Sequence, residues 1–434
     1  MDTSFAQRVQ YERLENGIDV AVLKTGVSDV VRCSVRFGSG SDALPSKPGR
    51  SMLLSGLLPA GVRGASRDDV LELFESLGAR VSVSVGAAAI EAHVTCRKAV
   101  FAEVLTTLFD MCGSPRVTER DFREVRMRIL NTLRIARDDT STRARTALMR
   151  ALYAKGNPHF AYTPEELAKD VERTTLADVR EHYRNLVGTV GGNVVVVGDV
   201  QPRATRSLIR DCVQSLHEGR SALRSMVQSD RVVSNAAART VVSMRDKMNI
   251  DTMFALPVSI TRDCDERIAL EAGVAILGSS GTGRLFRVLR SERSLTYGAV
   301  ASLAGLTEGY PGFLLGRALF PNDVYQTGEA AFLEVVTKWQ DKGVTSSELR
   351  RYKQEALGRY TVSLTTTASM CAALSAVLSA GRPVEYLDQY PNLVQDLRLS
   401  EVNSVIEEQC SGRTVTLAAA GSIDTNGKPL AATK

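Results

Sequence analysis

The sequence has 434 residues, which is more than one ordinary hydrophobic core accommodates, and this length favours two domains. Hydrophobic residues make up 44% and charged residues 24%, a composition typical of globular proteins and of neither disordered nor membrane proteins. The net charge of +5 is too small for this length to indicate a nucleic-acid-binding surface. No apolar run approaches the roughly 18 residues that a membrane span needs.

The start of the chain and its cysteines bear on the cellular compartment. Residues 1–8 contain no basic stretch followed by an apolar run, so no signal peptide is expected. The seven cysteines are scattered without a C-x-x-C pair, which favours free, mostly buried thiols and a cytoplasmic location. A periplasmic location is the alternative if the sequence is that of a mature form. The cysteines are Cys33, Cys96, Cys112, Cys212, Cys264, Cys371 and Cys410.

The first half of the chain mixes helices and strands. Ser66 and Asp69 form a capping-box pattern, which predicts a helix that begins there and stops at Gly78. Residues 81–85 then alternate between valine and serine, as in a strand with one buried face. We therefore expect an α+β fold of mostly antiparallel sheets with helices packed on one face.

A repeat suggests that the two halves are homologous. Residues 156–158 (Gly-Asn-Pro) recur 225 residues later at 381–383 (Gly-Arg-Pro). In each half an amphipathic helix follows, opening near Thr175 or Ser400, and then a buried strand that ends in glycine. Three features at one spacing predict a duplicated domain. We assign residues 1–216 and 239–434 to the two domains and residues 217–238 to a polar linker.

No local sequence pattern predicts a metal or phosphate site. His93 lies in an alternating strand, His159 in a loop and His182 on a helix near Asp178, where a surface helix pair explains it. Without H-x-x-x-H, H-E-x-x-H or C-x-x-C, only a site assembled from distant residues stays open. The glycine-rich residues 278–284 lack the P-loop lysine and predict a flexible loop.

Residues 37–61 resemble the first signature of the pitrilysin, insulinase and mitochondrial-processing-peptidase family of zinc peptidases. In that family this segment holds a helix with the motif H-x-x-E-H, whose two histidines bind zinc and whose glutamate activates water. The resemblance places Met52 and Gly56 at the histidine positions and Ser55 at the glutamate position.

The third zinc ligand of the family is a glutamate that stands seven residues after another glutamate on a later helix. Here Glu124 matches the first of these, and Asn131 occupies the ligand position. A thioether, a hydroxyl, a hydrogen and an amide cannot replace two imidazoles and two carboxylates around Zn²⁺. The resemblance therefore implies a degenerate zinc motif, with no metal and no cofactor in this chain.

Residues 285–298 resemble the second signature, R-L-F-x-x-L-R-x-x-x-x-L-x-Y, and retain its arginine and tyrosine as Arg290 and Tyr297. In the family the tyrosine is thought to stabilise the oxyanion and the arginine to hold the substrate backbone. Two structural alternatives stay open. Arg284, Arg287 and Arg290 could form one solvated basic stripe, and Tyr297 could be a core aromatic at the start of an apolar strand.

Loss of the zinc motif and retention of the Arg/Tyr pair imply a subunit without autonomous activity. We expect a heterodimer with a homologous H-x-x-E-H-bearing subunit, which carries the zinc and receives Arg290 and Tyr297. The substrates of this heterodimer would be unfolded or short peptides, bound by strand addition to a sheet edge. The alternatives are a structural or assembly subunit and a peptide-holding protein without a catalytic role. The resemblance extends to residues 345–349 (Thr-Ser-Ser-Glu-Leu), which open a long helix.

Overall fold

The computed structural model describes residues 4–37, 47–62, 64–85, 90–186, 192–214, 216, 239–279, 281–306 and 310–430. The predicted linker, residues 217–238, lies outside these described residues. The chain forms two compact units that are each assembled from three separate stretches of sequence. Unit 1 contains Met1–Thr132, Leu167–Gln228 and Arg359–Pro391, and unit 2 contains Leu133–Glu166, Ser229–Gly358 and Asn392–Lys434.

Unit 1 is built on a six-stranded sheet in the order β1-β2-β8-β3-β7-β6. All neighbouring strands are antiparallel except β2 and β8, which are parallel. The central strand β8 is buried at every residue, which explains its unbroken run of valines. The strands are β1 (Val9–Arg13), β2 (Asp19–Lys24), β3 (Val31–Phe37), β6 (Arg80–Val85), β7 (Ile90–Cys96) and β8 (Asn193–Gly198), and β4 (Gly61–Val62) and β5 (Ala65–Ser66) form a separate pair.

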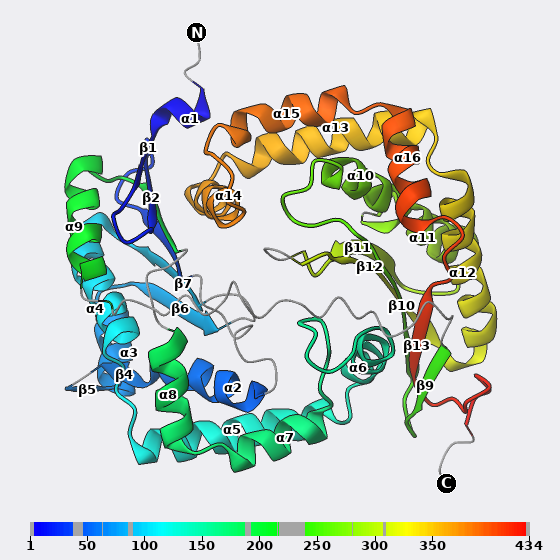
Figure 1. The fold of residues 1–434 in the computed structure, drawn as a ribbon, viewed down its shortest axis with the longest axis horizontal. Coiled ribbons are helices and arrows are strands. Elements are labelled where there is room, and N and C mark those ends of the chain that lie inside the picture. Colours follow the sequence, from blue (N-terminus) through cyan, green and yellow to red (C-terminus); the bar gives the residue numbers. More distant parts are fainter. Residues whose placement is uncertain are drawn as a thin grey trace. The chain divides into compact units, whose positions relative to one another are not determined.

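Helices cover both faces of this sheet (Figure 1). Helices α4 and α9 pack on one face, and α14, from the second half of the chain, packs against β3 and β8 on the other. Ser375 and Ser379 of α14 hydrogen-bond to the Asn193 side chain at 3.2 and 2.9 Å. Helices of this unit are α1 (Phe5–Arg8), α2 (Pro48–Leu57), α3 (Arg67–Ser76), α4 (Phe101–Gly113), α8 (Leu176–Leu186), α9 (Pro202–Gln214) and α14 (Thr367–Ser379).

Unit 2 is built on a five-stranded sheet in the order β11-β12-β10-β13-β9. Its strand order and directions match those of the β6-β7-β3-β8-β2 part of the first sheet, including one parallel pair, β13 with β9. This correspondence confirms the predicted duplication and the α+β class. The strands are β9 (Arg239–Ser243), β10 (Asn249–Pro257), β11 (Ala299–Ala304), β12 (Phe313–Pro321) and β13 (Thr416–Gly421).

The second sheet is also covered by a helix from the other half of the chain. Helix α6 packs on β10 and β13, where Leu148 and Leu152 are buried in a core cluster with Phe313. The buried Asp251 of β10 accepts hydrogen bonds from Thr140 of α6 at 2.7 Å and from Arg317 of β12 at 2.8 Å. Helices of unit 2 are α6 (Thr140–Leu152), α10 (Arg267–Gly278), α11 (Arg284–Phe286), α12 (Tyr325–Lys342) and α16 (Leu399–Cys410).

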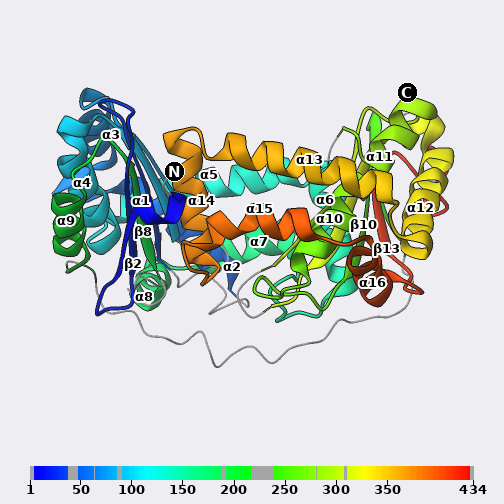
Figure 2. The ribbon, with the colours of Figure 1, turned by 90° about the horizontal axis from the view of Figure 1, so that it is seen from above.

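Four helices pass from one unit into the other, and two of them run side by side. Helices α13 and α15 are antiparallel neighbours (Figure 2), because Lys353 reaches the carbonyl of Gln395 at one end and Tyr360 that of Leu387 at the other. The four helices are α5 (Glu119–Ala136), α7 (Pro164–Arg173), α13 (Ser346–Ser363) and α15 (Tyr386–Asp396).

Two sequence expectations concern the cysteines and membrane spans. All seven cysteines are free, and all but the half-buried Cys264 are buried, as predicted. Over the part of the chain that the structure describes, no single helix has the length and apolarity of a membrane span. The pair α13 and α14 meets these criteria only when combined, with a bend of 111° between them.

Candidate functional site

The degenerate zinc motif lies on α2. Pro48 occupies the first turn of this helix, where a missing N–H costs nothing, and the carboxylate of Asp170 on α7 accepts a hydrogen bond from the Gly49 N–H at 2.7 Å. The helix carries Met52, Ser55 and Gly56 as half-buried residues. The three predicted motif positions therefore share a helix whose start is fixed by an acidic cap.

Gly56 of α2 packs closely against Val125 of α5. A Cβ atom at this glycine would lie 2.5 Å from the Cγ1 of Val125, far inside van der Waals distance. Val125 is itself only 3% exposed, so the two helices pack through the space that a side chain at position 56 would need. The second histidine position is thus filled by the neighbouring helix.

Asn131, the fourth motif position, is exposed on α5. Seven residues earlier on the same helix, Glu124 is also exposed. Its carboxylate forms an ion pair with Arg120, with an N–O distance of 2.9 Å. An amide and a thioether are poor zinc ligands, and a glycine offers none, so this residue set does not fit the metal. Over the described residues, no group of three His, Cys, Asp or Glu side chains is placed to hold a metal ion.

The interpretation of His182 as a surface helix residue is wrong. Its side chain on α8 is 0% exposed, and its Nε2 lies 2.9 Å from the Ser51 hydroxyl on α2. Asp178 instead forms an ion pair with Arg50 at 2.5 Å. Burial and the positive charge of Arg50 lower the pKa of His182 to about 4, so the imidazole is neutral at pH 7.

The second signature begins on α11 and continues as a π-helical turn over Arg287–Glu292. Such π-helical turns are rare and are frequently found at functional sites. Arg284 does not belong to a solvated stripe, because it forms two 2.7 Å hydrogen bonds with the largely buried carboxylate of Glu348 on α13. Arg287 binds Glu292 at 3.5 Å.

Arg290 differs from these arginines. It is exposed, and within the described ranges no carboxylate pairs with it. Its guanidinium carbon lies 4.8 Å from the centroid of the Phe286 ring, a cation–π contact that holds the side chain without neutralising its charge. The hydrogen-bond donors of the Arg290 guanidinium are therefore exposed to solvent.

Tyr297 is not a core aromatic, because its side chain is 82% exposed. The backbone around it is fixed. Leu295 and Thr296 are buried, the Leu295 N–H donates to the carbonyl of Leu289 at 2.8 Å, and the Thr296 hydroxyl donates to that of Leu319 at 2.5 Å. An exposed phenol thus stands on a segment that is anchored immediately before it, and packing does not account for the residue type.

Comparisons with known proteins agree with this geometry. Residues 173–356 match the peptidase M16 inactive domain. The chain is also 20% identical over 388 residues to the non-peptidase homolog YmxG of Helicobacter pylori (strain ATCC 700392 / 26695), covering 88% of this chain and 86% of YmxG. Over residues 173–356 the chain is therefore similar to the M16 inactive domain. The predicted family resemblance is confirmed, and these comparisons support a non-catalytic family member.

Two solved structures share the fold. The peptidase M16 inactive domain from Pseudomonas fluorescens superimposes with a TM-score of 0.86 at 20% identity, covering 98% of this chain and 99% of that chain. A protease from Helicobacter pylori gives a TM-score of 0.82 at 16% identity, covering 95% and 99%. The match to the M16 inactive domain includes the segment with Arg290 and Tyr297 and excludes α2.

Placing a histidine at position 56, as in the H-x-x-E-H motif, is expected to destabilise the protein. We expect Gly56→His to lower the free energy of unfolding by about 1–3 kcal/mol, because its Cβ overpacks the contact with Val125. Urea denaturation measures this cost. Adding Val125→Ala should recover part of it, as a coupling between the two substitutions.

Gly358 provides a matched control for that substitution. It also lies in a helix, α13, but a Cβ there meets no atom within 4 Å. Gly358→His should change the free energy of unfolding by less than about 0.5 kcal/mol. Equal effects of the two histidines would contradict the packing explanation.

Proposed function

We propose that the chain is the non-zinc subunit of a heterodimeric zinc metallopeptidase, in which a homologous H-x-x-E-H-bearing subunit carries the metal. The observation that carries this proposal is the 82% exposure of Tyr297 on an anchored segment, beside an exposed Arg290 without a carboxylate partner among the described residues. Two exposed side chains at the spacing of the family signature, neither explained by packing, favour binding to another molecule.

In the proposed complex the two side chains act on a peptide held at the partner's zinc site. The Tyr297 hydroxyl donates a hydrogen bond to the oxyanion that develops on the scissile carbonyl, and Arg290 donates to a backbone carbonyl of the peptide. A bond that strengthens as the oxyanion forms lowers the barrier rather than merely binding the substrate. The substrates are unfolded or short peptides.

Reconstitution tests this role. The chain is co-purified from its native cell, with cytoplasm and periplasm fractionated first, and the complex is then rebuilt from separately purified subunits. We expect the chain alone to hold no zinc and cleave no peptide, and the mixture to cleave at least tenfold faster than the partner alone. A partner equally active by itself would contradict the proposal and favour a structural or assembly subunit.

A second candidate, a peptide-holding protein without a catalytic role, is favoured by the edge of the first sheet. Strand β6 pairs with β7 on one side, and no described strand pairs with its other side. Its residues Arg80, Ser82 and Ser84 are exposed. An extended peptide could add here through backbone hydrogen bonds. Peptide binding by the chain alone, without any effect on the partner's turnover, would favour this candidate.

A further inference from the structure

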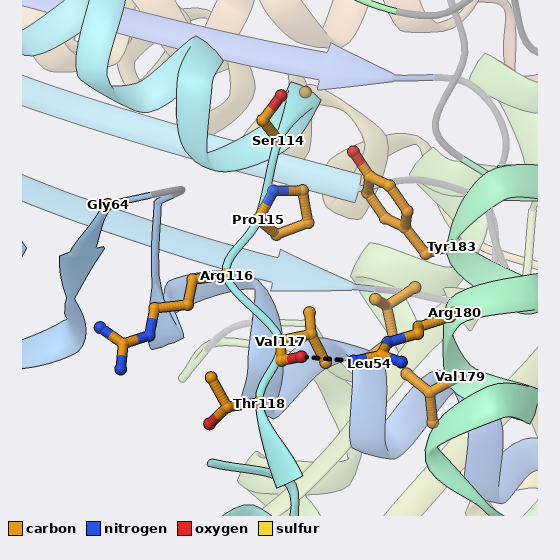
Figure 3. A pocket seen from close by; sticks show the side chains of 11 residues that line it. Leu54, Gly64, Ser114, Pro115, Arg116, Val117, Thr118, Val179, Arg180 and Tyr183 are labelled. Atoms are coloured by element: carbon orange, nitrogen blue, oxygen red, sulfur yellow. Dashed lines mark hydrogen bonds between the residues drawn. The ribbon is translucent and has the colours of Figure 1, made fainter. Parts of the chain in front are cut away.

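Unit 1 contains a cavity that the peptidase role does not use. It has a volume of about 620 Å³ and lies between α2, α8, the end of α4 and residues 114–118, the loop that joins α4 to α5. Figure 3 shows Tyr183, Arg180 and Val179 extending from α8 beside this loop, with Gly64 across it. The volume falls in the range of small-molecule sites. None of the four degenerate motif residues lines it.

The walls of the cavity are mainly apolar and already in place. Leu54 of α2, Val179 of α8 and Pro115 and Val117 of the loop line it, together with the ring of Tyr183. The Tyr183 hydroxyl is not available to donate to a ligand, because it already donates to the carbonyl of Cys112 at 2.6 Å. These walls suit the hydrocarbon part of a ligand.

One hydrogen bond to the end of α4 and two to the loop hold this wall of the cavity in position. Besides the bond from Tyr183, the guanidinium of Arg180 donates to the carbonyl of Val117 at 2.9 Å, and the Arg116 N–H donates to the carbonyl of Gly61 at 3.1 Å. A site that is ordered before binding spends little free energy on ordering its loop. The cavity is therefore preformed for a small ligand.

The charged side chains that line the cavity are positive. Arg116 and Arg180 line it, on opposite sides of the loop in Figure 3, and among the described residues no aspartate or glutamate does. Arg180 uses one guanidinium nitrogen for Val117, which leaves donors on its other nitrogens. The carboxylate of Asp121 is 4.0 Å from the Arg116 Nε, beyond hydrogen-bond distance. Both arginines can therefore donate to an anion.

We propose that this cavity binds a small apolar carboxylic acid. Its hydrocarbon body lies between Leu54, Val179 and the loop, and its carboxylate is stabilised by the charges of Arg116 and Arg180. An inorganic anion would leave the apolar walls uncovered, and an uncharged hydrocarbon would leave the remaining donors of the two guanidinium groups unused. The proposal does not depend on the peptidase role.

A pair of probes that differ only in charge tests the proposal on the full chain. 3-Phenylpropanoate and its uncharged analogue 3-phenylpropanamide are titrated and followed by ligand-observed NMR. We expect the carboxylate to bind at least tenfold more tightly than the amide. Binding of neither probe, or equal binding of both, would overturn the proposal.

Three variants locate the binding. Arg116→Gln should weaken binding of the carboxylate at least threefold and leave the amide unchanged. Ser114→Trp places an indole from an exposed position into the cavity and should weaken both probes at least tenfold. Arg184→Gln removes an exposed arginine of α8 outside the cavity and should change neither.

Thermal unfolding of each variant establishes that it is folded. If Ser114→Trp does not fold, Arg116→Gln decides the question, because the Arg116 side chain is 38% exposed and its ion pair with Asp121 is long, at 4.0 Å. Unchanged affinity of the carboxylate in Arg116→Gln, or an equal loss in Arg184→Gln, would place the binding elsewhere and overturn the proposal.

Discussion

Replacing Tyr297 by phenylalanine is expected to lower the kcat of the reconstituted complex about a hundredfold, the effect of losing one oxyanion donor. The substitution removes a single hydroxyl from a side chain that is 82% exposed, so the fold loses almost nothing. Steady-state kinetics with a short peptide measures kcat, and size-exclusion chromatography shows that the complex still assembles.

The same chemical change elsewhere in the chain serves as the control. Tyr11 on β1 is 47% exposed and its hydroxyl donates to Asp19 at 2.7 Å. Tyr11→Phe should leave kcat unchanged. If Tyr297→Phe gives an assembled complex with the turnover of the parent, the catalytic role of Tyr297 is wrong, and its exposure needs another explanation.

Local patterns predicted the individual elements well. The capping box at Ser66 and Asp69 opens α3, and the alternating run that follows is β6. The predicted buried strands before Gly198 and Gly421 are β8 and β13. Each of these features is set by neighbours within a few residues, through backbone capping or side-chain alternation. Such signals can be read without the tertiary structure.

The exchange of helices between the halves was not predictable in the same way. Apolar spacing shows that α6 and α14 each bury a face, but not which sheet covers it. The answer depends on contacts such as Thr140 with Asp251 and Ser375 with Asn193, which join residues 111 and 182 positions apart. The predicted domains, residues 1–216 and 239–434, concern homology between the two halves, and their boundaries stay a prediction. The compact units do not follow these boundaries, because each unit contains residues from both halves.

The site residues, too, were predictable only where local sequence signals determine them. The signature spacing singled out Arg290 and Tyr297, but it did not show that Arg284 is tied to Glu348 on another helix. His182 was misread because Asp178 stands four residues before it on one helix, whereas its true partner Ser51 is 131 residues away. Local spacing favours the near partner, and only the packing of α8 on α2 reveals the distant one.

Acid is expected to destabilise the protein through His182. The unfolded chain binds a proton at this imidazole near its ordinary pKa of about 6.5, whereas the folded chain does so only near 4. Between these values the unfolded state holds more protons, so stability is complete above about pH 6.5 and falls as the pH decreases toward 4. The full loss is about 3 kcal/mol, more than a hundredfold in the folding equilibrium.

Urea denaturation between pH 7.5 and 4 measures this dependence, and His182→Gln should flatten it. The comparison concerns the slope with pH, so a loss of stability at neutral pH in the variant does not obscure it. His159 is a fitting control, because burial also lowers its pKa, so His159→Gln should remove only its own, separate contribution to the slope. An unchanged slope in His182→Gln would contradict the assignment.

The acid effect reaches the degenerate motif because His182 and Ser51 join α8 to α2. Protonation places a second positive charge beside Arg50, whose partners Asp178 and Glu181 lie at 2.5 and 3.5 Å. The Asp178 carboxylate stays ionised through the range in which His182 titrates, since hydrogen bonds from Thr175 hold its pKa below the usual value. This carboxylate compensates Arg50 rather than the imidazolium, whose Nδ1 has no hydrogen-bond partner in the described structure. The helix that would carry zinc in an active relative is therefore expected to loosen first in acid.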